Sequence, residues 1–213
     1  MINKNNLIKK ILVLLIVLVV PSIGYFLLKT GENIYKPLRV LGPKEVASTF
    51  HRVKGKQIPD TIYHQVKMYP QEVKGHVFLA NFLLDSDKAV NKQSNEQMAR
   101  LVQYFSKNPE VRFVTFSANP GYLEDSLKTD NWIVVNDAKL TLAKAAKQQY
   151  LLSEIQIDSI ANKAISSQRF VLVDDQQRIR GIYQIKNRFN VDSLIEDIKV
   201  ATVEMLRAQT KMK

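Results

Sequence analysis

The chain of 213 residues contains no cysteine, which excludes disulfide bonds, thiol nucleophiles and thiolate metal ligands. Histidine is also scarce: His51, His64 and His76 are far apart in the sequence and form none of the close pairs typical of a zinc site. The sequence lacks a P-loop, a dinucleotide-binding glycine loop and a serine-hydrolase nucleophile motif as well. We therefore expect a protein that is not an enzyme, with no catalytic residues and no cofactor.

The histidines leave one alternative open. His64 and His76 would meet if their segments paired as strands, whereas single structural or surface roles suit three isolated histidines better.

Acidic residues are outnumbered, with 20 Asp and Glu against 31 Lys and Arg and a net charge of +11. The basic residues are scattered singly and in pairs, without the basic stripe interleaved with aromatic residues that predicts nucleic-acid binding. A generally basic solvated surface is expected, attraction to lipid headgroups is the second interpretation, and no nucleic acid is expected as a partner.

One long apolar run stands out, from Ile11 to Leu28, without a charged residue. At helical rise it reaches about 27 Å, close to the thickness of the hydrocarbon core of a bilayer. The residues that follow Tyr25 offer no small-residue cleavage site, and a lipoprotein would need a cysteine. The run therefore predicts an uncleaved transmembrane helix at residues 11–28, with the lipid bilayer as a partner.

The charges around this run predict its orientation. Lys4, Lys9 and Lys10 precede it with no acid among them, so the positive-inside rule places residues 1–10 in the cytoplasm. We expect a single-pass protein of the bacterial inner membrane, with a stalk at 29–56 and a periplasmic domain at 57–213.

Hydrophobic periodicity indicates alternating strands and helices in that domain. Strands are expected at 61–66, 76–84, 111–117 and 132–135, and a strand hairpin at 169–174 and 178–184. Helices are expected at 95–107, 122–128, 140–149 and 191–205, the last with Asn190 as its N-cap. Residues 151–165 fit neither pattern. The order βαβ, a helical connection and ββα predicts an α/β domain of thioredoxin-like fold, a central mixed sheet flanked by helices.

Six segments of the sequence also resemble the Sco/SenC family, membrane-anchored copper chaperones of thioredoxin fold that help to assemble cytochrome c oxidase. They are Tyr35–Pro43 (YKPLRVLGP), Asp60–Val66 (DTIYHQV), Lys74–Phe82 (KGHVFLANF), Val111–Pro120 (VRFVTFSANP), Asn131–Val135 (NWIVV) and Arg169–Tyr183 (RFVLVDDQQRIRGIY). All six are framework segments and none is a catalytic motif.

The resemblance implies where a copper site would lie, and the ligands are missing there. The two family cysteines fall on Asp87 and Asn91, and the family histidine falls on Ser166. Two thiolates and an imidazole suit Cu(I), whereas these oxygen and amide groups do not. Asp85 and Asp87 supply too few oxygens for calcium or magnesium, so no metal site is expected.

We therefore expect a non-catalytic Sco-like module that binds a membrane or periplasmic protein, in cytochrome oxidase assembly or as an accessory subunit of that complex. One alternative is a copper chaperone or redox protein with unrecognised or partner-supplied ligands. Another is a structural domain that anchors the cell envelope.

Overall fold

The computed structural model describes residues 13–25, 36–53, 55–84, 88–122, 129–158, 160, 163–165, 168–185 and 188–211. The chain divides into two compact units, residues 1–36 and 37–213. In the first unit, residues 13–25 are helical. No helix in the described ranges is both long enough and apolar enough to cross a membrane. The predicted span at 11–28 also includes residues 11–12 and 26–28, which lie outside those ranges.

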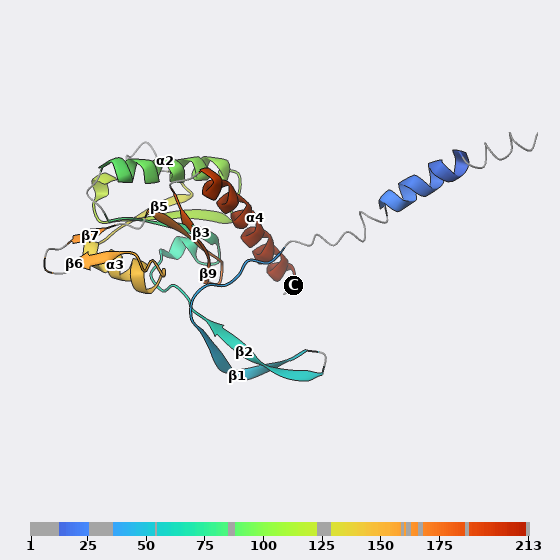
Figure 1. The fold of residues 1–213 in the computed structure, drawn as a ribbon, viewed down its shortest axis with the longest axis horizontal. Coiled ribbons are helices and arrows are strands. Elements are labelled where there is room, and N and C mark those ends of the chain that lie inside the picture. The colour runs from blue at the N-terminus through green and yellow to red at the C-terminus, as the bar shows by residue number, and fades with distance from the viewer. Residues whose placement is uncertain are drawn as a thin grey trace, which may run out of the picture. The chain divides into compact units, whose positions relative to one another are not determined.

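The second unit is built on a five-stranded sheet with the order β5-β4-β3-β8-β9 (Figure 1). β3, β4 and β5 run parallel, and β8 and β9 are antiparallel to their neighbours. The strands are β3 (Val77–Leu83), β4 (Val111–Ser117), β5 (Trp132–Asn136), β8 (Arg169–Val173) and β9 (Ile179–Gln184). The predicted mixed sheet of a thioredoxin-like α/β fold is confirmed.

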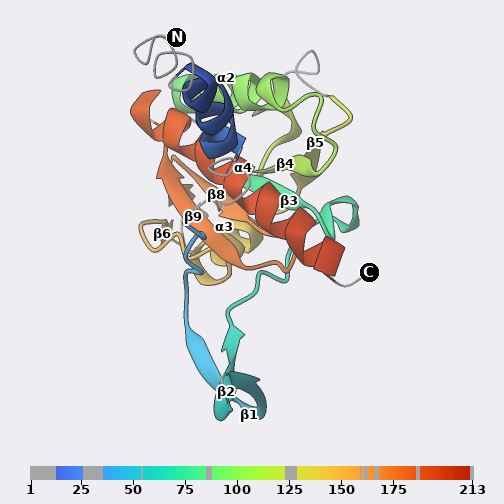
Figure 2. The ribbon, with the colours of Figure 1, turned by 90° about the vertical axis from the view of Figure 1, so that its right-hand side faces the viewer.

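Helices cover both faces of this sheet, so the unit has three layers (Figures 1 and 2). Helix α2 (Lys88–Tyr104) and helix α4 (Arg188–Lys211) pack on one face, against Leu79 of β3 and Phe113 of β4. Helix α3 (Lys139–Gln148) covers the other face. All seven residues of β3 are buried, which is why all but Asn81 are apolar, without alternation.

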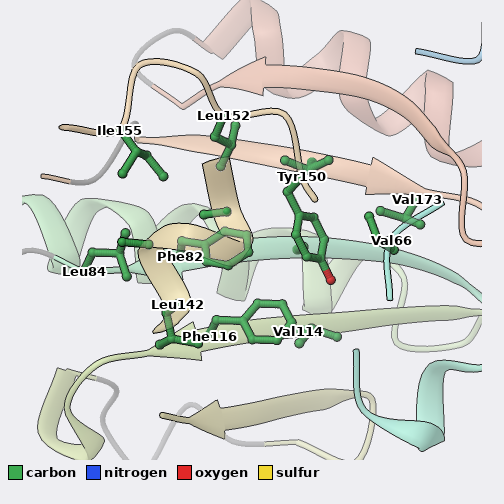
Figure 3. Packing of buried hydrophobic residues seen from close by; sticks show 14 of the residues in the cluster. Val66, Phe82, Leu84, Val114, Phe116, Leu142, Tyr150, Leu152, Ile155 and Val173 are labelled. Atoms are coloured by element: carbon green, nitrogen blue, oxygen red, sulfur yellow. The ribbon is translucent and has the colours of Figure 1, made fainter. Parts of the chain in front are cut away.

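The core on the α3 face is centred on three aromatic rings (Figure 3). Phe82 and Phe116 are stacked with centroids 4.8 Å apart, and Tyr150 meets Phe82 edge-on at 4.9 Å. The Tyr150 hydroxyl donates a hydrogen bond of 2.7 Å to the carbonyl of Met68, so its one polar group is paired. Aromatic pairs of this geometry add roughly 0.5–1.5 kcal/mol beyond their burial.

A second sheet, which the sequence did not predict, begins in the range assigned to the stalk, 29–56, and ends in the range assigned to the domain. β1 (Lys44–Val53) and β2 (Lys56–Tyr63) form an antiparallel hairpin that stands away from the sheet in both views (Figures 1 and 2). Part of the predicted strand at 61–66 is the end of β2. The remaining short elements are η1 (Gln71–Val73), η2 (Pro120–Tyr122) and the paired strands β6 (Gln156–Asp158) and β7 (Lys163–Ile165).

The segment before β1 is fixed to the domain. The backbone N–H of Leu38 donates to Glu204 Oε1 at 2.9 Å, and its carbonyl accepts from Arg180 Nη2 at 2.7 Å. The N–H of Leu41 donates to the carbonyl of Ile179 at 2.8 Å. The chain therefore enters the domain between β9 and α4 before the hairpin begins.

Two predicted helix starts are wrong. α2 begins at Lys88 and not at residue 95, because its first half buries polar side chains that the apolar pattern misses. α4 begins at Arg188, so Asn190 lies inside the helix and is not the N-cap. The predicted short helix at 122–128 falls on residues outside the described ranges, except for Tyr122 at the end of η2.

Candidate functional site

The carboxyl ends of β3 and β4 meet the first half of α2, at the edge of a parallel sheet where α/β proteins place their ligands. The residues buried there are polar. We call this group the polar layer. It consists of Asn81 on β3, Thr115 and Ser117 on β4, and Asn91, Ser94 and Asn95 on α2.

The polar layer forms where the facing side chains of β3 and α2 both change from apolar to polar. Along β3 the residues facing α2 go from Val77 and Leu79 to Asn81. Along α2 the buried stripe begins with Asn91 and Ser94 and continues into Met98, Leu101 and Val102, and Phe105 follows directly after the helix. Polar side chains of α2 therefore pack on polar side chains of the strands at the carboxyl edge. Toward the other end of the sheet, apolar side chains pack on apolar ones.

Hydrogen bonds join the layer to its surroundings. Ser94 Oγ donates to Asn81 Oδ1 at 3.0 Å, which ties α2 to β3. Asn95 Nδ2 donates to the carbonyl of Tyr122 at 2.6 Å, which ties α2 to η2. On β4, the indole N–H of Trp132 donates to Thr115 Oγ1 at 2.9 Å. The bonds of Ser94 and Asn95 hold the first half of α2 in one position over the sheet, and that of Trp132 joins β5 to β4.

The loop after β4 is closed in the same way. Ser117 Oγ donates to the carbonyl of Asn119 at 2.6 Å, and Asn119 Oδ1 accepts the N–H of Gly121 at 2.9 Å. An amide at this position turns the loop without adding a charge.

Asn81 Nδ2 and Asn95 Oδ1 lack a hydrogen-bond partner within the described part of the chain. Both side chains are at most 5% exposed. Buried polar atoms are nearly always paired, and each one left unpaired costs roughly 1–3 kcal/mol. The unpaired atoms of the layer therefore lower the stability of the fold, while its hydrogen bonds fix the position of α2.

Of the three positions that the resemblance assigns to the copper ligands, the structure describes one. Asn91 lies on α2 and is 4% exposed, as part of the polar layer. Asp87 and Ser166 lie outside the described residues, as does Asp85. The structure therefore places one predicted position in the layer and leaves the convergence of the three as a prediction.

The histidines lie elsewhere, and the segments of His64 and His76 are not paired as strands. His64 Nε2 is 2.7 Å from the carbonyl of Gln149, and His76 Nδ1 is 3.2 Å from the carbonyl of Lys74. His51 Nδ1 is 2.6 Å from Asp60 Oδ1 on the β1–β2 hairpin. Across the described ranges, no group of three or more His, Asp or Glu side chains is arranged to hold a metal ion.

The chemistry open to the polar layer follows from its groups. Amides and hydroxyls donate and accept hydrogen bonds, but none of the six titrates near neutral pH. Activating a serine as a nucleophile needs an adjacent base, and none of the three histidines lies in the layer. The layer can therefore hold α2 in register or bind a polar group, and it has no general base of its own.

Known structures provide the comparison. No family profile and no curated protein matches the sequence. The structure is similar to a SCO1/SenC family lipoprotein from Bacillus anthracis str. Ames, with a TM-score of 0.51 and 20% identity over 78% of this chain and 97% of that one. The fold is Sco/SenC-like.

Two other solved structures are looser matches. BsSco, a member of the Sco family of cytochrome c oxidase assembly proteins, is 18% identical over 81% of this chain and 99% of its own, with a TM-score of 0.47. ScoI from Bradyrhizobium japonicum, solved with copper bound, is 14% identical over 69% and 92%, with a TM-score of 0.41. This chain is Sco-like in fold and has no cysteine.

Sequence reasoning missed the polar layer, although a signal for it exists. Asn91, Ser94 and Asn95 are spaced i, i+3 and i+4, and they extend the stripe that begins at Met98 backward by two turns. A search for apolar residues alone stops at Met98.

Proposed function

We propose that the chain is a non-catalytic, membrane-anchored Sco-like module that binds a protein partner in the assembly of a respiratory complex of the cytochrome oxidase type. Its N-terminus is cytoplasmic and its domain periplasmic, in a bacterial inner membrane. One observation carries the proposal: a Sco-like framework is complete in the absence of any cysteine, and Asn91 is buried in a layer of amides and hydroxyls.

The framework supports a binding role because it is well packed. The sheet has a buried core on each face, and the entry segment is pinned by Arg180 and Glu204. A scaffold retained without its reactive groups offers surfaces for recognition. The proposed role in respiratory-complex assembly is based on the resemblance to Sco/SenC proteins. The proposed membrane location is based on the apolar run at 11–28.

Co-purification tests this role. The full chain, tagged at its C-terminus, is isolated from detergent-solubilised membranes, beside a control in which residues 1–36 carry an unrelated soluble domain. We expect oxidase subunits or their assembly factors to be enriched with the full chain and not with the control. Equal recovery in both, or recovery of cell-wall components only, would contradict the proposal and favour the structural alternative.

Copper binding separates the module from a working chaperone. Oxygen and amide groups are poor ligands for Cu(I), so the purified chain should retain no stoichiometric copper after dialysis against a moderate chelator. Retained copper would favour a metallochaperone, and His64 and His76 would then be the first residues to replace.

A further inference from the structure

The β1–β2 hairpin contacts the domain at its base, and its other end points away from the domain (Figures 1 and 2). At the base, the N–H of His64 donates to the carbonyl of Pro43 at 3.1 Å, and the Arg178 guanidinium lies 5.7 Å from the centre of the Tyr63 ring. Both views show the hairpin projecting away from the five-stranded sheet (Figures 1 and 2). Its strands pair from Lys44 with Tyr63 to Val53 with Lys56.

Both faces of the hairpin carry exposed apolar side chains. Side chains alternate between the faces of a ribbon, and cross-strand partners share a face. The register therefore puts Val46 and Phe50 on one face, and Ile58 and Ile62 on the other. Val46 is 78% exposed, Phe50 61% and Ile62 54%. A two-stranded ribbon is marginal in water on its own, so this amount of exposed apolar surface indicates a binding surface.

The free half of the hairpin is basic. Arg52 and Lys56 are exposed there. The acid of this half, Asp60, is paired with His51. The charge at this end therefore fits an anionic surface.

The two-sided apolar character decides between anionic partners. An acidic protein laid against the ribbon would cover one face and leave the other in water. A ribbon that enters the headgroup layer end-first has both faces surrounded, while Arg52 and Lys56 meet the phosphates. We propose that the β1–β2 hairpin inserts its free end into the headgroup region of a bilayer that contains anionic lipid, and so sets the orientation of the domain. This inference rests on the membrane location in the proposed function, but not on the protein partner.

The absence of cysteine makes the test direct, because Gln57→Cys gives the full chain a single thiol at the exposed end of β2. A fluorophore on that thiol is read in vesicles that carry a lipid-attached quencher. The vesicles are phosphatidylcholine alone, or phosphatidylcholine mixed with phosphatidylglycerol. Gln103→Cys on α2, on the far side of the domain from the hairpin in both views, provides the reference position (Figures 1 and 2).

We expect quenching at residue 57 in the anionic vesicles, and weaker quenching in neutral vesicles or at high salt. Each basic side chain near an anionic surface is worth roughly a fivefold gain in partitioning, so R52E with K56E should lower it by at least about 25-fold. The matched control, R100E with K107E, makes the same change of charge elsewhere on the domain and should leave the signal unchanged.

The outcomes separate this inference from the proposed function. A chain that does not float with either kind of vesicle contradicts both. A chain that floats while residue 57 stays unquenched overturns the hairpin contact alone, and a dimer seen by light scattering would then identify a second copy as the occupant. Equal quenching in neutral vesicles, or quenching that survives R52E with K56E, overturns the role of anionic lipid.

Discussion

The guanidinium of Arg180 lies 2.9 Å from the carboxylate of Asp174, and the two side chains are only 5% and 2% exposed. The same guanidinium also binds the carboxylate of Glu204 and the carbonyl of Leu38. One buried cation thus joins the β8–β9 turn, the last helix and the entry segment. Its hydrogen bonds to both acids raise the pKa of Arg180 in spite of its burial, which by itself lowers it.

Replacing Arg180 by alanine should destabilise the domain severely. The change leaves the buried Asp174 carboxylate with Arg178 as its remaining cationic partner, and breaking a buried pair in this way costs about 3–5 kcal/mol. Urea unfolding of the full chain measures the loss. Arg178→Ala is the control: Arg178 also contacts Asp174 but is 21% exposed, so its loss should cost less. Equal costs would show that burial does not decide the strength of these pairs.

Ser94→Ala tests the polar layer. It removes the hydrogen bond to Asn81 and leaves the whole Asn81 amide without a side-chain partner, at a cost of about 1–3 kcal/mol. Adding Asn81→Leu removes the buried amide as well, so the double variant should be more stable than Ser94→Ala alone. Denaturant unfolding of the four proteins gives the coupling energy. Strictly additive effects would mean that the two residues do not act as a pair.

Asp175 should make the stability of the domain depend on pH. Burial, and next the charge of Asp174, raise its pKa above the ordinary value of 3.8. The native state therefore holds this proton more tightly than the unfolded state, and the resulting stability is lost as pH rises through the native pKa. Asp175→Asn should raise the melting temperature at neutral pH, and the gain should vanish as pH falls toward 3.8. A gain of the same size at every pH would point to a cause other than titration.

Copper ligands restored at the family positions test the resemblance itself. Asp87→Cys, Asn91→Cys and Ser166→His together should give the chain Cu(I) affinity, because two thiolates and an imidazole form a soft site. The control carries Asp87→Ser, Asn91→Ser and Ser166→Ala. A folded triple variant that binds no more Cu(I) than this control would contradict the predicted convergence, unless moving the histidine to position 165 or 167 restores binding.

Protease treatment of intact spheroplasts tests the predicted orientation. Digestion of residues 37–213 and protection of a short N-terminal peptide are expected, since Lys4, Lys9 and Lys10 precede the apolar run. A domain that is protected until the cells are lysed, or a mature chain that starts after Leu28, would show that the prediction is wrong.

The elements that the sequence predicted well are those whose burial is complete. β3 and β8 sit in the middle of the sheet, so nearly every residue is apolar and the signal is continuous. The β8–β9 hairpin was equally clear, because a polar turn divides two apolar runs. Burial in the fold requires apolar residues in these strands, and the same apolar residues make the strands recognisable in the sequence.

The elements that were missed depend on contacts with other segments of the chain, which their own residues do not reveal. β1 is exposed along nearly its whole length, and its pairing with β2 is what makes it a strand. The first half of α2 is buried by polar contacts, such as Ser94 with Asn81, 13 residues earlier. The suggested strand pairing of the His64 and His76 segments is wrong, and His64 instead contacts the carbonyl of Gln149 at the end of α3.

Pinning Leu38 between Arg180 and Glu204 has a mechanical consequence. Tension applied through the N-terminal segment reaches the domain first at these two hydrogen bonds and then at Leu41 with Ile179. It is thereby transmitted to α4 and to the β9 edge of the sheet, and it bypasses the β1–β2 hairpin, which follows later in the chain. Tension on the N-terminal segment therefore does not strain the hairpin, which can bend or bind independently. The force is borne by the entry segment near the N-terminus and by α4 at the C-terminus.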